Sequence, residues 1–217
     1  MNQDNPEPLS EIRIAEERVV YENSYGRLYD DKVVFEPRGV RGTYVRWQWR
    51  APYSVAVLPI IGGRHALLVE VYRHSARAVS AEAVMGFGDA ELDPEAVAGK
   101  ELAQELGLVV PGELWPTGVV HPDPAFAAHP HHCFIAWLDD TEGGVSPAPE
   151  PSEVIVGTRS VDLLTARPDF QDHVRDAVTL VLLHQARDYI LGRAEARDRL
   201  GGAALCDGGR PGRPAGP

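Results

Sequence analysis

The stretch Gly86–Leu108 has the sequence GFGDAELDPEAVAGKELAQELGL, and it decides the fold that we expect for the whole chain. Its second half carries helix signals at both ends. Asp93 is a favourable N-cap, Pro94 suits the first helical position, and Gly107 stands where a C-terminal cap is expected. Apolar side chains recur every four positions between these ends, at Ala98, Leu102 and Leu106. The stretch therefore predicts a glycine-rich loop followed by a capped, half-buried helix.

Two acidic residues of this helix share one face. Glu101 and Glu105 are four residues apart, which places one a single turn above the other, and Gln104 lies beside them. Stacked carboxylates next to a glycine-rich loop can hold a hard divalent cation through oxygen ligands. The alternative is a solvated helix face, although like charges at this spacing are mildly unfavourable without a reason. Spacing alone leaves both interpretations open.

The composition limits the classes of function. The chain has 217 residues, of which 44% are hydrophobic and 24% charged, and these values fit one soluble globular domain. The net charge of −11 argues against a nucleic-acid partner, because such surfaces are basic. No apolar run approaches the ~18 residues of a membrane span, so we expect no membrane partner. Cys133 and Cys206 are too few for a disulfide scaffold, and the N-terminus lacks a signal-peptide pattern, which predicts a reduced, cytoplasmic protein.

The flanking sequence predicts many short strands and few helices. The predicted strands cover residues 18–22, 27–35, 43–50, 54–61, 64–72, 82–86, 114–120, 133–138 and 153–159, and a short helix at 162–164 and a long helix at 171–191 follow. Hairpins predominate over strand–helix–strand alternation, which indicates an α+β or sandwich fold with a mixed β-sheet and helices packed on it. We expect a flexible leader at 1–17, one domain over 18–192 and a disordered Gly/Pro-rich tail at 193–217.

The strand at 43–50 carries candidate binding residues. It alternates between two faces, one with Trp47 and Trp49 and the other with Arg46 and Arg50. Such a strand is either part of a core or dimer surface, or it stacks a base and holds a phosphate.

The loop at 121–132 contains three prolines and a group of histidines. These are His121, His129, His131 and His132. They are either solvated loop residues or ligands of a transition metal.

The central stretch resembles the Nudix box. That motif consists of Gly, five residues, Glu, seven residues and then Arg-Glu-apolar-x-Glu-Glu-x-Gly-apolar. Aligned from Gly86 without gaps, the chain has Glu101 at the first helical Glu and Glu105 at the last Glu of the pair. Six further segments are similar to the ADP-ribose pyrophosphatase branch of this family. They are VAVLPII, ALLVEVYRH, AEAVMG, HPDPAF, HHCFIAWL and EVIVGTRSVDLL. The resemblance covers roughly residues 18–192.

The resemblance implies a fold and a reaction. The fold is a mixed β-sheet sandwiched between α-helices, with N-terminal antiparallel strands at 18–50 and a catalytic core at 51–192. The reaction is hydrolysis, dependent on Mg²⁺ or Mn²⁺, of the pyrophosphate bond in a nucleoside diphosphate linked to another moiety, such as ADP-ribose or a nucleotide sugar. Members of the branch exchange their N-terminal strands across a dimer, so we expect a homodimer.

The resemblance also implies the roles of individual residues. The implied metal ligands are Glu101, Glu105, the Met85 carbonyl and Gln104. The implied general base is Glu153 or Glu150, and Arg73 is the residue that contacts phosphate. Weaker candidates for the nucleoside end are Arg46, Arg50, Trp47 and Trp49. For Arg73 the alternative is a salt bridge at a strand end, and for Glu153 and Glu150 it is a surface position. Glu153 fits the base better because it immediately precedes a predicted strand.

Three residues depart from the motif. Leu92 occupies the position of the early Glu, Lys100 replaces the Arg, and Gln104 replaces one Glu of the pair. Gln104 offers an oxygen without charge, so a further metal is expected to bind more weakly. Lys100 keeps the charge of Arg but lacks its planar fork of donors. These substitutions favour slow hydrolysis or, as an alternative function, a catalytically silent domain that binds a nucleotide or a protein partner.

Overall fold

The computed structural model describes residues 11–110, 113–139, 145, 154–165 and 173–199, with side chains described as far as residue 192. The chain divides into two compact units. Unit 1 comprises residues 1–52 and 123–129, and unit 2 comprises residues 53–122 and 130–217. The division after residue 52 lies two residues beyond the predicted boundary at 50/51. The return of 123–129 to unit 1 was not predicted.

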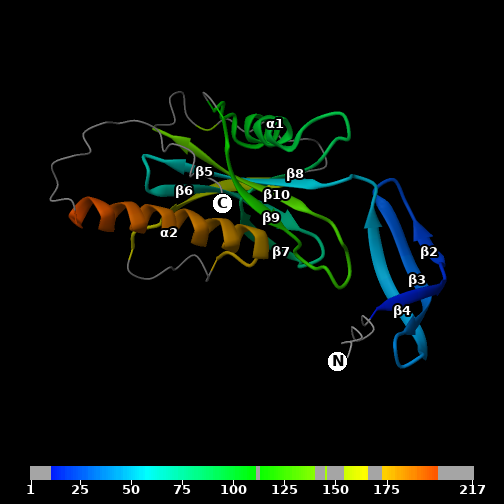
Figure 1. Ribbon diagram of the computed structural model, residues 1–217. Coiled ribbons are helices and arrows are strands. Elements are labelled where there is room, and N and C mark those ends of the chain that lie inside the picture. Colours follow the sequence, from blue (N-terminus) through cyan, green and yellow to red (C-terminus); the bar gives the residue numbers. More distant parts are fainter. Residues whose placement is uncertain (1–10, 111–112, 140–144, 146–153, 166–172, 200–217) are drawn as a thin grey trace, which may run out of the picture. The chain divides into compact units, whose positions relative to one another are not determined.

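Unit 1 is a four-stranded antiparallel sheet (Figure 1). Its strands are β1 (Ile12–Glu16), β2 (Val19–Glu22), β3 (Gly26–Phe35) and β4 (Val40–Trp49). Strand β3 pairs with β4 along its whole length, while β1 and β2 pair with the other side of β3. The prediction of a flexible leader is wrong for residues 12–16, because they form β1 by pairing with residues 32–35 of β3.

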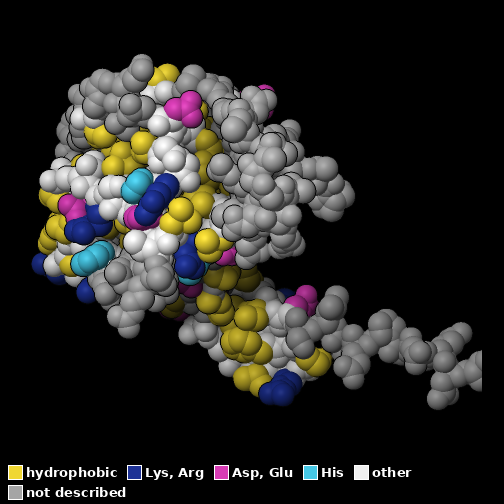
Figure 2. Space-filling view, turned by 90° about the vertical axis from the view of Figure 1, so that its left-hand side faces the viewer, with side chains coloured by type: hydrophobic (Ala, Val, Ile, Leu, Met, Phe, Trp, Pro, Cys, Tyr) yellow, Lys and Arg dark blue, Asp and Glu magenta, His cyan; other side chains and the backbone are white. Residues whose placement is uncertain are grey.

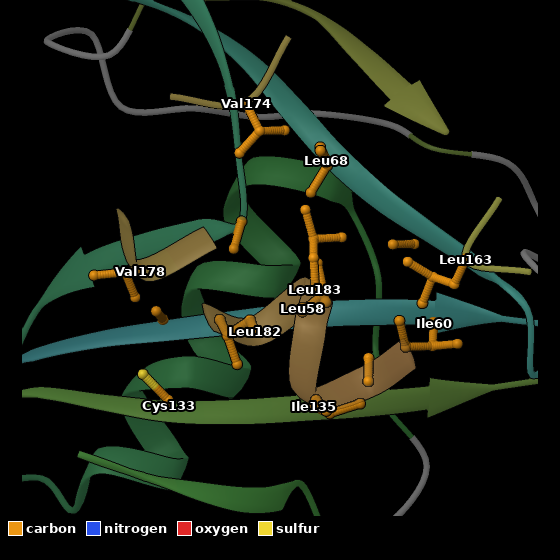
Figure 3. Close-up of a cluster of buried hydrophobic side chains, with 14 of the residues drawn as sticks. Leu58, Ile60, Leu68, Cys133, Ile135, Leu163, Val174, Val178, Leu182 and Leu183 are labelled. Carbon is orange, nitrogen blue, oxygen red and sulfur yellow. The ribbon is translucent and has the colours of Figure 1, made fainter. Parts of the chain in front are cut away.

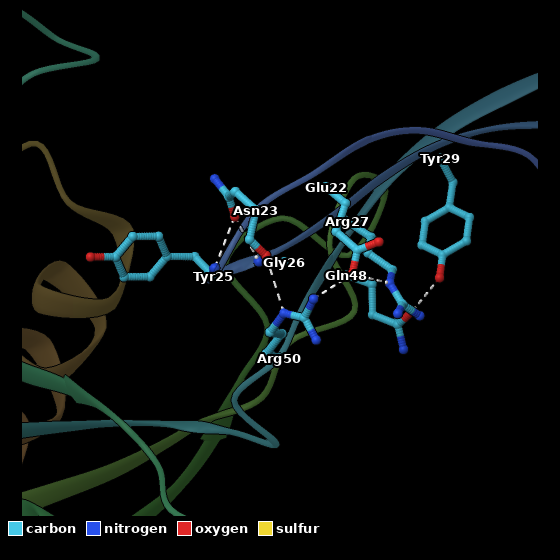
Figure 4. Close-up of polar contacts among 8 residues, drawn as sticks. All are labelled: Glu22, Asn23, Tyr25, Gly26, Arg27, Tyr29, Gln48 and Arg50. Carbon is cyan, nitrogen blue, oxygen red and sulfur yellow. Dashed lines mark hydrogen bonds and ion pairs between the residues drawn. The ribbon is translucent and has the colours of Figure 1, made fainter.

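The turn between β2 and β3 follows the predicted turn chemistry. The Asn23 side-chain oxygen accepts hydrogen bonds from the backbone N–H groups of Tyr25, at 2.8 Å, and Gly26, at 3.0 Å (Figure 4). Glycine is required at position 26, since an added Cβ would lie 2.5 Å from the backbone oxygen of Gln48. The turn therefore fixes the register of β3 against β4 at its first pair, Gly26 with Trp49.

Unit 2 is built on a seven-stranded mixed sheet. Its strands are β5 (Ser54–Ile61), β6 (His65–Arg73), β7 (Ala78–Glu82), β8 (Val84–Phe87), β9 (Trp115–Val120), β10 (His131–Leu138) and β11 (Ile155–Asp162). The main path runs β11-β6-β5-β10-β9, with β7 paired to β6 and β8 paired to β5. Strand β10 runs parallel to β5, and the other described pairs in this sheet are antiparallel. The predicted mixed sheet and α+β class are confirmed.

The two helices of unit 2 cover opposite faces of this sheet (Figure 1). Strand β5 is buried on both sides, because Val55 and Val57 face the core under α1 (Pro94–Leu106) and Leu58 faces the core under α2 (Ala177–Arg199). Figure 3 shows the second core, where side chains of β5, β6 and β10 pack against α2.

The helix ends test the predicted boundaries. Helix α1 has Asp93 as N-cap, with its side chain accepting from the Ala96 N–H at 2.9 Å, and Gly107 in the left-handed conformation as C-cap, as predicted. Helix α2 begins at Ala177, later than the predicted residue 171, because Asp176 caps it through the Thr179 N–H at 2.6 Å. It extends to Arg199, beyond the predicted domain end at 192. Residues 163–164 form a turn, so the short helix predicted at 162–164 is absent.

None of the described helices combines the length and apolarity needed to cross a membrane.

Candidate active site

The paired acids of α1 are buried. Glu101 is 9% exposed and Glu105 is 4% exposed, so the alternative of a solvated helix face is wrong. They lie on the face of α1 that also buries Leu102 and Leu106 against the sheet. Burial of a carboxylate is costly unless other groups compensate its charge.

Glu101 lies directly against the backbone of β8. A Cβ built on Gly86 would come within 2.5 Å of the Glu101 Cγ and closer still to its carboxylate. Ordinary carbon contacts are ~3.5 Å or longer, so only glycine permits this approach. Met85 precedes Gly86 on β8, and its side chain packs against the core under α2. The first glycine of the motif therefore has a physical role, which is to admit the carboxylate of α1.

Gln104 supplies a further oxygen on the same helix. Its Oε1 atom is buried and has no hydrogen-bond partner within the part of the chain that the structure describes. An unsatisfied buried oxygen beside two buried carboxylates suits a hard cation. Among the described residues, no group of three or more His, Cys, Asp or Glu is arranged to hold a metal ion. Further ligands would have to come from main-chain or amide oxygens, or from Glu150 and Glu153, which lie outside the described residues.

Arg73 and Glu82 form a two-point ion pair at the ends of β6 and β7. Arg73 Nε donates to both carboxylate oxygens at 3.1 Å, and Nη2 donates to Oε2 at 2.5 Å. The Glu82 side chain is only 6% exposed, whereas that of Arg73 is 47% exposed. The Glu82 hydrogen bond raises the pKa of Arg73 against the opposing effect of burial, and the charges of Asp176 and Glu105 act in the same direction. The strand-end salt bridge that was the alternative for Arg73 is present, and the charge of Glu105 on α1 also acts on Arg73.

Glu82 is a site residue that the sequence reasoning missed. It is the one charged residue in the segment AVSAEAVMG, and it is 5% exposed. A single acid in an apolar run was the signal that could have identified it.

Arg46 of β4 and Arg50, which directly follows β4, are held by acids within unit 1. Arg46 donates to Asp31, which is 1% exposed, at 2.6 Å and to Glu17 at 2.7 Å, and its guanidinium lies 3.7 Å from the Tyr29 ring centroid. Burial opposes the charge of Arg46, but these two acids outweigh it and raise its pKa. Arg50 forms an ion pair with Glu22 and donates to the Asn23 carbonyl (Figure 4).

The tryptophans of β4 share one face, as predicted. The rings of Trp47 and Trp49 meet edge to face at 5.4 Å, and Trp49 lies 6.0 Å from the His129 ring. The backbone N–H of Trp47 donates to the Phe126 carbonyl at 2.8 Å, which attaches the segment 123–129 to β4. The β4 candidates thus belong to unit 1, while the acids of α1 and Arg73 belong to unit 2.

The histidines of the loop do not form the transition-metal site that was one alternative. No metal-binding group occurs among the described residues, which include all four histidines. His129 is 6% exposed and lies in unit 1, whereas His132 lies in unit 2 with its ring 5.3 Å from that of Tyr53. The other alternative, solvated histidines, is also wrong for His129, which is buried.

Comparisons with known proteins identify a shared fold. No family model matches the chain, and no curated protein matches it. A solved structure described as an ADP compounds hydrolase superposes with a TM-score of 0.68, covering 86% of this chain and 97% of that one at 18% sequence identity. At this identity the likeness establishes the fold.

Proposed function

We propose that this chain is a Nudix-type hydrolase that cleaves the pyrophosphate bond of a nucleoside diphosphate linked to another moiety, of the ADP-ribose or nucleotide-sugar kind. The observation that carries the proposal is the pair of buried carboxylates, Glu101 and Glu105, packed against the Gly86 backbone. The fold shared with an ADP compounds hydrolase supports it.

The buried oxygens of α1 fit a divalent cation. Glu101 and Glu105 would hold Mg²⁺ or Mn²⁺, with Gln104 Oε1 and the Met85 carbonyl as neutral ligands. Such a cation, when bound, neutralises phosphoryl oxygens and lowers the pKa of the attacking water. The unsatisfied Gln104 oxygen is the feature that this arrangement explains best.

Arg73 is the residue proposed to hold the substrate phosphate. Its guanidinium is fixed by Glu82 yet remains about half exposed, so it is oriented and accessible at once. In the reaction, water adds to one phosphorus and the bridging oxygen leaves on the other phosphate. A carboxylate must take the proton of the water, and Glu153 or Glu150, outside the described residues, is proposed for this role.

A substrate panel tests the proposal. Hydrolysis of ADP-ribose, nucleotide sugars and dinucleotides is measured by ³¹P NMR with Mg²⁺, with Mn²⁺ and with EDTA. We expect cation-dependent cleavage of at least one compound by the wild type. The Glu105→Gln variant should lose it while keeping its circular dichroism spectrum, and Gly99→Ala on the same helix should keep it. Folded protein that cleaves nothing with either cation would refute the proposal.

A second function is favoured by the residues that depart from the motif. Leu92, where a carboxylate is expected, is 45% exposed, and Lys100 is exposed as well. A domain without these groups could bind a nucleotide or a protein partner and leave it intact. ADP-ribose would then raise the melting temperature without hydrolysis. If the combined changes Leu92→Glu, Lys100→Arg and Gln104→Glu produced hydrolysis, the lack of activity in the wild type would be due to these three positions.

We also propose that the protein is a homodimer. Hydrophobic side chains reach the surface in patches (Figure 2). In unit 1, large hydrophobic residues that are 46–57% exposed are Ile12, Ile14, Val19, Val20, Tyr21, Tyr25, Val40 and Val45. Apolar surface of this kind favours an interface. Light scattering coupled to size exclusion should give twice the 23.7 kDa chain mass, and a value of one chain mass would contradict the proposal.

A further inference from the structure

The segment between β8 and α1 connects Gly86 to the helix that carries Glu101 and Glu105. It continues from Gly86, against which Glu101 packs, to the N-cap Asp93. Within it, the Asp89 side chain accepts from the Glu91 N–H at 2.9 Å, and the Asp89 carbonyl accepts from the Leu92 N–H at 3.2 Å. These bonds shape the segment internally, but they do not attach it to the sheet.

Tyr53 attaches this segment to the sheet through its hydroxyl. The residue immediately precedes β5, and its hydroxyl contacts the Leu92 carbonyl at 2.5 Å and the Asp89 carbonyl at 3.0 Å. A tyrosine has a single O–H, so the two carbonyls share one donor. The contact thus ties both ends of the 89–92 turn to one side chain.

Backbone and ring contacts of Tyr53 hold the first half of the segment. The Tyr53 carbonyl accepts from the Gly88 N–H at 2.8 Å, which extends the β5–β8 pairing beyond Ser54 and Phe87. A Cβ on Gly88 would lie 2.6 Å from the Tyr53 Cζ, so glycine is needed for the ring to lie over it. The His132 ring meets the Tyr53 ring edge-on at 5.3 Å. The aromatic ring is therefore fixed between β10 and the segment.

We propose that Tyr53 is a positioning residue for the candidate active site, which holds the segment 88–92 and thereby the Gly86 backbone against Glu101. This inference rests on the proposed function. The exposed Leu92 side chain cannot supply a polar anchor for this segment, and the Tyr53 hydroxyl supplies one through the Leu92 main chain. A tyrosine hydroxyl has an ordinary pKa of about 10, and burial raises that of Tyr53 further, so this hydroxyl can donate at neutral pH.

The test compares Tyr53→Phe with Tyr44→Phe. Both changes remove one tyrosine hydroxyl that contacts a main-chain carbonyl, since the Tyr44 hydroxyl donates to the Ala125 carbonyl at 2.7 Å in unit 1. Three quantities are measured: amide hydrogen exchange of residues 88–92, Mn²⁺ affinity by electron paramagnetic resonance, and kcat and KM on any substrate that the panel identifies.

For Tyr53→Phe we expect exchange of the 88–92 amides to be about tenfold faster, Mn²⁺ to bind several-fold more weakly, and kcat to fall about tenfold with KM nearly unchanged. Tyr44→Phe should leave all three at wild-type values. If Tyr53→Phe folds poorly, Gly88→Ala is measured in its place, because a Cβ at Gly88 would displace the Tyr53 ring from the other side of the same contact. The same changes in exchange, Mn²⁺ affinity and kcat are expected for Gly88→Ala.

The outcomes separate this inference from the proposed function. Exchange at the wild-type rate in Tyr53→Phe would overturn the anchor. Faster exchange with unchanged Mn²⁺ affinity and kcat would overturn the positioning role. If the wild type hydrolyses nothing, the proposed function fails, and exchange together with Mn²⁺ affinity still decides whether Tyr53 positions the site.

Discussion

Gly86→Ala should displace the Glu101 side chain directly. The new Cβ would lie 2.5 Å from the Glu101 Cγ, and relief to a normal contact of ~3.5 Å requires about 1 Å of movement. Glu101 is 9% exposed, so its side chain cannot simply turn into water. Overpacking of this kind costs about 1–3 kcal/mol of stability. A displacement of about 1 Å in an active site can lower the rate about 100-fold.

Gly99→Ala is the matched control, because it makes the same chemical change on the helix that carries Glu101. A Cβ at Gly99 meets no atom within 4 Å. Alanine in a helix interior is favoured over glycine by about 0.5–1 kcal/mol, so this variant should be more stable than the wild type. Because Gly86→Ala should lower the stability and Gly99→Ala should raise it, the pair separates the clash with Glu101 from the effect of any glycine-to-alanine change.

The assay combines urea denaturation with Mn²⁺ binding and hydrolysis. We expect Gly86→Ala to lower the free energy of unfolding, to weaken Mn²⁺ binding and to reduce the rate, while Gly99→Ala preserves the last two. If Gly86→Ala keeps wild-type stability and Mn²⁺ affinity, then the close approach of Glu101 to β8 does not position the carboxylate, and the reasoning fails.

Three further predictions concern charges elsewhere in unit 2. The ion pair with Arg64 lowers the pKa of Asp162 to about 2, below its ordinary value of 3.8. The ion pair therefore stabilises the folded state above pH 4, and this stabilisation is lost as the pH falls from 4 to 2. The melting temperature of Arg64→Ala should therefore differ from wild type at pH 6 and converge with it at pH 2. Arg73→Ala leaves the buried Glu82 carboxylate unpaired and should cost about 2–3 kcal/mol, whereas Glu82→Gln leaves a half-exposed arginine and should cost about 1 kcal/mol, both measured by urea denaturation. Burial raises the pKa of Cys133 to about 11, so its thiol is protonated and unreactive at pH 8. Iodoacetamide at pH 8 should therefore label the Cys133 peptide only after unfolding, as measured by mass spectrometry.

Elements with local signals could be predicted from the sequence. The caps Asp93 and Gly107 lie where they were expected, because capping depends on residues within one turn. Strand β5 also has its predicted bounds, 54–61, since a continuous apolar run ends at a glycine pair in the left-handed conformation. Strand β1 was missed because its partner is β3, and a five-residue strand gives little periodicity.

At the candidate sites, long-range partners determine what the local sequence pattern leaves open. The periodicity of α1 placed Glu101 and Glu105 on one face, but their burial depends on the sheet that this face meets. Arg46 was a weaker candidate for the nucleoside end, and no local pattern indicated that Asp31 of the neighbouring strand lies 2.6 Å from it. The contacts of Tyr53 with residues 88–92 were equally out of reach, because they depend on how β8 pairs with β5.

The charges around α1 explain why a cation would be needed for the proposed reaction. Two carboxylates are buried four residues apart in a chain whose net charge is −11, and neither burial nor like charge favours the folded state. The charge of Glu105 acts on Arg73, and part of the positive charge of Arg73 is balanced by the Glu82 carboxylate. A pyrophosphate would bring further negative charge to this end of the sheet. Without added positive charge it would be repelled, so hydrolysis that persists at the same rate in EDTA would contradict the role assigned to Glu101 and Glu105.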